Sequence, residues 1–241
     1  MVKEELIKRS PLRVFEQSLQ GGMLGKGNLG ILTSRKGVGK TACLVHIATD
    51  KLFRGEHVIH VSFSANVNRV IAWYTDIFDE IARKRSLEHV SEVRDETVKH
   101  RVIMNFNQQH ITINQIISSL RALIVDGGFH ADAIMFDGYR LTMAPIDDIQ
   151  EIREFARTMN VEVWFSVSAL DDDVPYDTYG VSDPVRELTP YVDLLVGLTY
   201  ADDHVELTVV KDRDNTEPKR MHLKLDPKTL LIVEESEPIE P

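Results

Sequence analysis

The stretch that most limits how this chain can fold is residues 34–41, which read SRKGVGKT. An apolar run at 29–33 precedes it and helical periodicity over 42–52 follows it, so the order is strand, glycine-rich loop and helix. Gly37 and Gly39 allow backbone torsions that a Cβ would obstruct, so successive N–H groups can point at an anion beside the helix N-terminus. The pattern predicts a phosphate-binding loop; the alternative is a chance glycine-rich turn followed by a lysine.

Two side chains of this loop have the expected chemistry. Lys40 would reach the β- and γ-phosphates of ATP, and Thr41 offers a hydroxyl to Mg²⁺, a hard cation that prefers oxygen ligands. Ser34 stands where the GxxxxGK[ST] pattern usually has its first glycine, and a small residue is expected to be tolerated there. The predicted nucleotide-binding residues of the loop are Ser34, Arg35, Lys36, Gly37, Val38, Gly39, Lys40, Thr41 and Ala42.

A carboxylate for the same site is predicted at the end of another buried strand. Residues 132–137 form an apolar run that ends in Asp137. Phosphate-loop proteins place at such a strand end the residue that holds the Mg²⁺ shell. The alternative is an aspartate that caps a turn with Gly138. Thr41 and Asp137 are therefore the predicted metal-site residues.

Strand-like and helix-like segments alternate along most of the chain. The predicted strands, besides the two above, are 57–63, 102–106 and 161–168, and the predicted helices are 67–84, 113–125 and 145–159. This alternation predicts an α/β fold with a mostly parallel sheet flanked by helices, and with ligand beyond the carboxyl ends of the strands. An antiparallel extension is predicted from strands at 193–199, 205–210 and 221–225. Residues 83–101 are expected to be a solvated helix and 171–190 a mobile surface loop.

The length of 241 residues and a hydrophobic fraction of 43% fit one large α/β domain. We expect a lead-in segment at 1–27 that includes a short helix, the nucleotide-binding domain at 28–232, and an acidic, frayed tail at 233–241.

The charge balance and the single cysteine limit which partners and which cellular compartment can be expected. A net charge of -10 opposes broad attraction to nucleic acid or to an anionic membrane, because such binding is driven by phosphate neutralisation. Cys43 cannot form an internal disulfide, which favours a reducing compartment. No stretch of about 18 apolar residues exists, and the first residues do not have the pattern of a signal peptide. A cytoplasmic location is therefore expected.

Several motifs together resemble the RecA-like ATPases, with the KaiC and hexameric-helicase (DnaB-like) branches closest. They are the lead-in LQGGMLGKG at 19–27, the SRKGVGKT loop, the strand ending in VSFS, the Asp137 strand, the VEVWFSVS strand and the VVKDRDN hairpin. The resemblance covers residues 11–232. It implies a RecA-type core, Mg-ATP at a subunit boundary, and a homo-oligomer in the form of a ring or filament, such as a hexamer.

The resemblance also implies roles for residues outside the loop. Ser168 falls where the family keeps a polar residue that senses the γ-phosphate, and Lys211 and Arg213 match a K-x-R pair that in relatives reaches the ATP of the neighbouring subunit. A cation supplied by a neighbour would stabilise charge on the γ-phosphoryl oxygens. A charged surface hairpin is the alternative for that pair. The expected catalytic set is Lys40, Asp137, Lys211 and Arg213.

One departure from the family affects the expected activity. Relatives place a glutamate after the second strand to orient and deprotonate the attacking water, but here the sequence is SFSAN at 62–66, and Gly138 follows Asp137. A serine hydroxyl does not accept a proton near neutral pH, and losing such a base costs about 10²- to 10⁴-fold in rate. The expectation is a protein that binds ATP but hydrolyses it slowly or not at all, and acts as a nucleotide-dependent switch for assembly or partner binding.

Two other functions compete with the switch. One is a DNA-dependent recombination or helicase-type motor, but residues 171–184, where relatives have a DNA-binding loop, contain five aspartates and no Lys or Arg. The other is a small-molecule kinase, which needs an acceptor pocket and an arginine-rich lid that the sequence does not locate.

Overall fold

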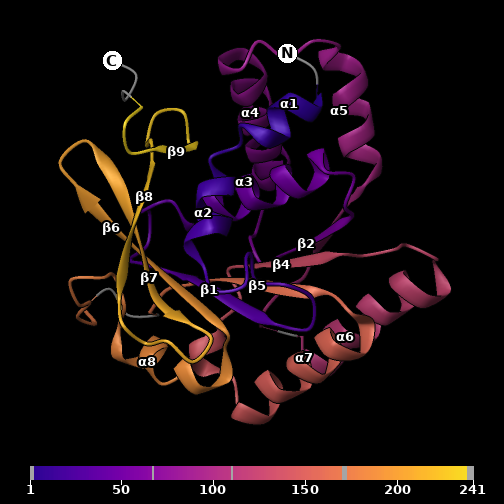
Figure 1. Cartoon of the computed structure of the whole chain (residues 1–241). Helices are drawn as coiled ribbons and strands as arrows, with labels where there is room; N and C mark the ends of the chain where they lie inside the picture. The colour runs from indigo at the N-terminus through magenta and orange to yellow at the C-terminus, as the bar shows by residue number, and fades with distance from the viewer. Residues whose placement is uncertain (1–2, 67, 110, 170–172, 238–241) are drawn as a thin grey trace.

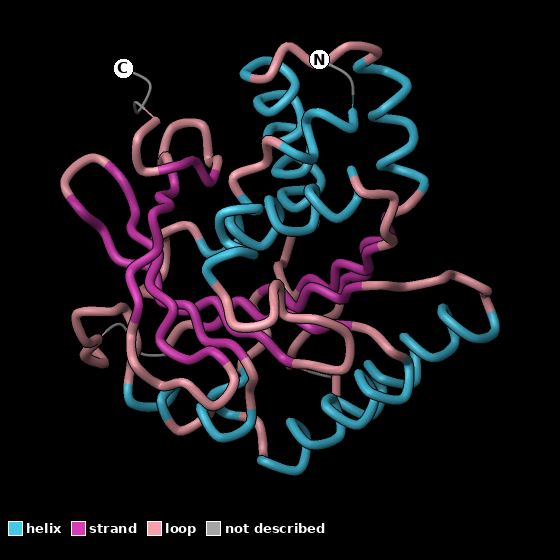
Figure 2. The backbone as a smooth tube through the Cα atoms, in the orientation of Figure 1, coloured by secondary structure: helices cyan, strands magenta, loops and turns pink. Residues whose placement is uncertain are grey.

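Short apolar runs form the parallel part of a large sheet (Figures 1 and 2). The computed structural model describes residues 3–66, 68–109, 111–169 and 173–237. Its parallel strands are β1 (Leu29–Thr33), β2 (Val58–Ser62), β3 (Arg101–Asn105), β4 (Ala133–Asp137), β5 (Glu162–Val167) and β6 (Leu194–Ala201). Every residue of β1, β2, β4 and β5 is buried, as expected for strands covered on both faces.

Three antiparallel strands extend this sheet at one edge. They are β7 (His204–Asp212), β8 (Lys219–Leu225) and β9 (Ile232–Glu234). Within the described ranges the sheet has nine strands in the order β3-β2-β4-β5-β1-β6-β7-β8-β9. The α/β fold with a mostly parallel sheet and a C-terminal antiparallel extension is thus confirmed.

Helices cover the two faces of the sheet (Figure 1). One layer contains α1 (Lys3–Lys8), α2 (Leu12–Ser18), α3 (Lys40–Phe53), α4 (Asn68–Lys84) and α5 (Val90–Lys99); the other contains α6 (Ile113–Arg121), α7 (Ile146–Met159) and the short α8 (Asp183–Arg186). Alternate strand residues supply the two cores: Leu32 and Trp164 belong to the first, whereas Ile31 and Phe165 belong to the second. None of the helices in the described ranges combines the length and the apolar character that crossing a membrane requires.

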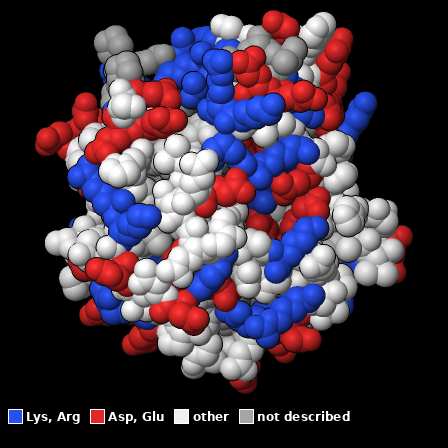
Figure 3. Space-filling model, in the orientation of Figure 1, with Lys and Arg blue, Asp and Glu red and all other residues white. Residues whose placement is uncertain are grey.

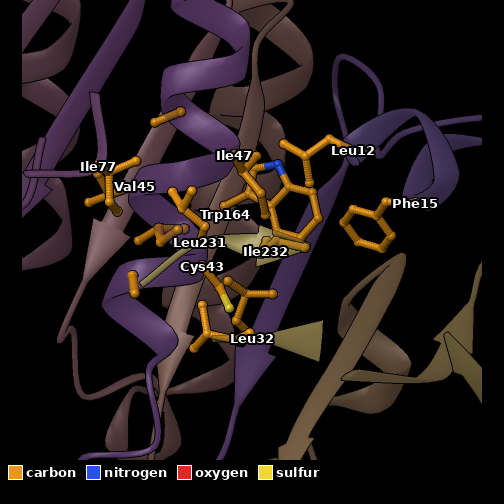
Figure 4. Close-up of a cluster of buried hydrophobic side chains, with 14 of the residues drawn as sticks. Leu12, Phe15, Leu32, Cys43, Val45, Ile47, Ile77, Trp164, Leu231 and Ile232 are labelled. Carbon is orange, nitrogen blue, oxygen red and sulfur yellow. The ribbon is translucent and has the colours of Figure 1, made fainter. Parts of the chain in front are cut away.

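Trp164 lies at the centre of the first core. Figure 4 shows its ring between Ile47 of α3 and the side chains of Leu12 and Phe15 from α2. The Phe15 and Trp164 ring centroids are 6.3 Å apart, and both residues are essentially fully buried. The lead-in helix α2 is therefore packed into the same core as α3.

The segment 171–190 is not only a loop. Its described part contains α8 and a 3₁₀ turn, Thr189–Tyr191, and the side chains of Val181, Val185 and Leu188 are buried in the second core. These three apolar residues anchor the segment, although aspartates and prolines dominate its composition. Asp171 and Asp172, on which part of the prediction rested, lie outside the described residues.

Three other boundaries differ from those predicted. The expected solvated helix at 83–101 begins only at Val90, as α5, and two of its ten residues, Val93 and Thr97, are buried. The helix at 113–125 becomes a π-helical turn after Arg121. The expected tail starts at residue 233, but this residue lies inside β9. Because β9 pairs with β8, Val233 is only 2% exposed. Residues 67 and 238–241, which the predicted α4 and tail include, lie outside the described residues.

A buried histidine connects the end of the chain to α3. The backbone N–H of Ile232 in β9 donates to Nδ1 of His46 at 2.8 Å. Burial, together with the nearby charge of Arg85, lowers the pKa of His46 to about 3. The imidazole is therefore neutral in the folded protein at neutral pH and can accept this bond.

This arrangement predicts a loss of stability in acid. The unfolded chain takes up a proton at His46 near pH 6.5, whereas the folded chain resists it down to about pH 3, so the free energy of unfolding falls as the pH drops through this window. In His46→Asn, the asparagine Oδ1 can accept the same hydrogen bond without titrating. This change is expected to reduce the slope of the free energy of unfolding against pH by up to about 1.4 kcal/mol per pH unit between pH 4 and 6. Urea unfolding across this range measures it.

His89→Asn is the matched control, because His89 is a largely exposed histidine with a left-handed backbone that asparagine accepts. In His89→Asn, the free energy of unfolding should change with pH between 4 and 6 as steeply as it does in the unchanged protein. If His46→Asn showed that same steepness, the prediction would be contradicted.

Candidate functional site

The carboxyl ends of four neighbouring strands bring the predicted site together. Ser62 at the end of β2 is in register with Asp137 at the end of β4, and Asp137 is in register with Ser166 in β5. β5 in turn pairs with β1, after which the glycine-rich loop leads into α3. A cleft with an empty volume of about 1290 Å³, open to solvent, lies between these strand ends, the loop and the start of α4.

The two glycines of the loop have the backbone conformations that the sequence required. Gly37 has φ 82° and Gly39 has φ 123°, a region that residues with a Cβ rarely adopt. A Cβ on Gly39 would lie 2.3 Å from Cδ2 of Leu225 in β8, whereas one on Gly37 would meet nothing within 4 Å. The hydroxyl of Tyr200 in β6 donates to the carbonyl of Gly37 at 3.2 Å. The antiparallel extension therefore packs directly against the loop.

Lys40 lies across the loop that precedes it. Its Nζ donates to the carbonyl of Ser34 at 3.1 Å, to the hydroxyl of Ser34 at 3.0 Å and to the carbonyl of Arg35 at 2.8 Å. Burial lowers the pKa of Lys40 to about 8, although the nearby carboxylate of Asp137 opposes that shift. The ammonium group is thus incompletely compensated in the cleft, and an anion bound beside it would relieve that cost.

Thr41 and Asp137, which are 96 residues apart in the sequence, are in direct contact. The Thr41 hydroxyl donates to Oδ1 of Asp137 at 2.9 Å. The Ser166 hydroxyl donates to the same oxygen at 2.6 Å and accepts from the backbone N–H of Gly138 at 3.0 Å. Since Thr41 donates its proton to the carboxylate, its oxygen lone pairs remain available to a cation.

This donor set fits Mg²⁺. Magnesium is bound in proteins through one or two oxygen ligands together with waters and substrate phosphates rather than by a cage of side chains. The described residues contain no cluster of three or more His, Cys, Asp or Glu side chains that could hold a metal. Thr41 and Asp137 are the residues that would hold the ion.

The polar contact from β5 involves a serine that the sequence analysis did not select. Ser168, the predicted residue, lines the cleft, but it is Ser166 that touches Asp137. Both serines line the cleft, although Ser168 lies just beyond the end of β5. The WFSVS run contains both serines. Pairing β5 with β4 in parallel register would have shown that Ser166 lies opposite Asp137.

The charge of the cleft is opposite to that of the whole chain. Its lining includes the cations Lys36, Lys40, Arg69 and Arg140, whereas Asp137 is its one carboxylate among the described residues. Elsewhere the signs are mixed: Figure 3 shows acidic and basic side chains interspersed across one face of the molecule. A polyanion of small size is therefore attracted locally, although the protein is acidic overall.

No carboxylate stands where a general base would be expected. Ser64 lines the cleft after β2, and its hydroxyl donates to the carbonyl of Asn66 at 3.3 Å. Asp137 already accepts two hydrogen bonds through Oδ1 and is the residue suited to the metal. The described lining offers no second acid that could deprotonate a water.

Lys211 and Arg213 do not reach this cleft. Lys211 pairs with Leu195, which pairs with Ile31 in the middle of β1. Arg213 follows Asp212, whose partner Leu194 pairs with Gly30 near the start of β1, and neither cation lines the cleft. The Lys211 Nζ donates to the carbonyl of Thr189 at 2.6 Å. Arg213 donates to the carbonyl of Met23 at 3.1 Å and to the carboxylate of Asp212 at 2.5 Å.

The remaining loop residues have supporting positions. The Arg35 guanidinium lies 5.3 Å from the centroid of the Tyr176 ring, which ties the loop to the segment after β5. Val38 and Ala42 are buried in the first core, and Ser34 is fully buried, which explains why a small side chain occupies that position. Lys36 is exposed and lines the cleft.

Comparison with known proteins assigns no family to the chain: no family model matches it, and no curated protein matches it significantly. The site is therefore defined by its own geometry and chemistry.

The contrast between the two glycines predicts unequal effects of a single added methyl group. Gly37→Ala is expected to cost about 1–2 kcal/mol, because alanine is strained at positive φ but meets no neighbour. Gly39→Ala has the same kind of strain plus the overlap with Leu225, which adds about 1–3 kcal/mol. Urea unfolding of the two variants measures the difference, and the double variant Gly39→Ala/Leu225→Ala should be less destabilised than the sum of the single changes. Equal losses in Gly37→Ala and Gly39→Ala would show that Leu225 does not restrict the loop.

Proposed function

We propose that this protein binds Mg-ATP in the cleft and acts as a nucleotide-dependent switch for assembly or partner binding, with slow or absent hydrolysis. The observation that carries the proposal is the contact of Thr41 with Asp137 beside Lys40, at the mouth of a glycine-rich loop. A lysine and a hydroxyl from the start of α3 meet there with a carboxylate from the end of β4, in the combination that a magnesium-bound triphosphate requires.

Each group has a distinct task in this proposal. The loop N–H groups and the N-terminus of α3 would bind the phosphate oxygens, and Lys40 would exchange its carbonyl partners for the β- and γ-phosphates. Thr41 and Asp137 would hold Mg²⁺, which when bound neutralises charge on those phosphates. Arg69 and Arg140 add positive charge to the lining of the same cleft.

The lining of the cleft supports binding more than turnover. Positioning and electrostatic stabilisation of the phosphates are available, but a group that would deprotonate or orient the attacking water is missing from the described lining. We infer that occupancy rather than hydrolysis produces the functional signal.

Assembly is the part of the proposal that rests on the resemblance to RecA-like ATPases. Lys211 and Arg213 do not line the cleft of their own chain, so in this proposal they would act on a nucleotide bound to a neighbouring copy. Both cations would have to leave their present carbonyl partners to do so. A ring or filament, with a hexamer among the options, would supply that geometry.

The proposal predicts assembly without turnover. Static light scattering should give a larger mass with Mg-ATP than without it, while phosphate release in the same samples stays below about one turnover per minute, as expected if the missing base costs about 10²- to 10⁴-fold. Lys40→Ala should abolish the response, because the phosphates lose their lysine. Lys99→Ala, a change on the exposed side of α5, is the control and should leave the response intact.

Two outcomes would contradict this prediction. Steady hydrolysis at several turnovers per second that disappears in Lys40→Ala would show an active ATPase. Hydrolysis stimulated by single-stranded DNA, with DNA affinity that falls steeply with salt, would favour the motor instead.

A further inference from the structure

A buried histidine beside the proposed metal site has a ring nitrogen without a partner. His60 in β2 is fully buried, and its Nδ1 lies 3.1 Å from the hydroxyl of Tyr74 in α4. Its Nε2 makes no hydrogen bond within the described residues and lies 4.0 Å from Oδ2 of Asp137. Buried polar atoms without a partner are uncommon in folded proteins, so this one calls for a physical explanation.

The contact with Tyr74 determines which nitrogen carries the proton. Burial raises the pKa of the Tyr74 hydroxyl, which therefore keeps its proton, and in the described part of the chain its hydrogen-bond partner is His60 Nδ1. We assign this hydroxyl as the donor to Nδ1, and a neutral imidazole then carries its own proton on Nε2.

Neighbouring groups hold both the Tyr74 ring and the Asp137 carboxylate in place on the two sides of His60. The Arg101 guanidinium stacks 4.1 Å from the centroid of the Tyr74 ring, which keeps the phenol against β2. On the Asp137 side, Thr41 and Ser166 both donate to Oδ1, while Oδ2 has no hydrogen-bond donor among the described residues. A movement of about 1 Å would turn the 4.0 Å separation into an ordinary N–H···O hydrogen bond.

We propose that His60 is a positioning residue for the metal carboxylate. Its Nε2–H donates to Oδ2 of Asp137 when Mg-nucleotide occupies the cleft, while Thr41 and Ser166 hold Oδ1, so that the carboxylate has one orientation toward the ion. The inference rests on the proposed function, because it concerns the affinity of that site for Mg²⁺. Groups that orient metal-binding side chains in this way typically change metal affinity by about 10- to 100-fold when removed.

Two isosteric substitutions test which nitrogen matters. The side-chain amide nitrogen of glutamine can occupy the place of Nε2, whereas that of asparagine matches Nδ1. His60→Gln should therefore keep Mg²⁺ affinity within about threefold of the unchanged protein, while His60→Asn and His60→Leu should lose about tenfold. The measurement is the Mg²⁺ dependence of binding of a fluorescent ATP analogue, with binding in EDTA as the reference that should not change.

Two further measurements separate positioning from a purely structural role. Nitrogen-15 NMR of the histidines should show the Nε2–H form of His60 in the free protein and a shift of that nitrogen on addition of Mg-nucleotide. Tyr74→Phe, which removes the donor to Nδ1, should increase the Nδ1–H form and weaken Mg²⁺ affinity. His89→Asn, at a largely exposed histidine that does not line the cleft, is the control and should leave Mg²⁺ affinity unchanged.

The outcomes distinguish the two proposals. If the unchanged protein binds the nucleotide equally well with Mg²⁺ and in EDTA, or not at all, the proposed function fails. If binding depends on Mg²⁺ but His60→Asn and His60→Gln behave alike, the role of His60 is wrong. Should His60→Leu fail to fold, the Gln and Asn pair and the NMR signal still decide the question.

Discussion

The structure depends on the burial of α3, the helix that begins at the glycine-rich loop. Twelve of its 14 residues are buried, so its polar side chains cannot face water and must find partners inside the protein. Asp50 is paired with Arg13 of the lead-in, and Lys51 is paired with Glu162 of β5 at 2.8 Å. His46 accepts from Ile232 of β9. Each pairing connects α3 to a different part of the chain, and together they fix the direction in which its N-terminus points.

Because α3 is fixed in this way, the antiparallel extension becomes part of the candidate site. Leu225 of β8 packs against Gly39, and Tyr200 of β6 contacts Gly37, so strands far from the loop in sequence limit its conformations. The loop is therefore supported on the side away from the cleft. A preorganised backbone of this kind loses less entropy when it binds an anion, which is the physical advantage of such support.

The cleft combines strong features for binding with weak ones for reaction. Four cations and one carboxylate line its described part, so a polyphosphate with a divalent cation matches its charge. Asp137 is surrounded by donors on Oδ1 and by the His60 imidazole near Oδ2, an arrangement suited to holding a carboxylate still rather than to moving a proton. Ser64, which lines the cleft after β2, supplies a hydroxyl there rather than a carboxylate. These features are consistent with a site that reports occupancy.

The sequence by itself determined the features whose residues are neighbours along the chain. The loop at 34–41, the alternation of strands and helices, and the strand-end Asp137 all follow from local spacing and turn chemistry. Strand register decided the rest: it placed Ser166 rather than Ser168 against Asp137, brought His60 beside that carboxylate, and kept Lys211 out of the cleft. It also paired β9 with β8 in a segment that composition alone marked as a tail. The physical reason is that local patterns report backbone preference and burial, whereas contacts between distant residues depend on which strands pair and in what register.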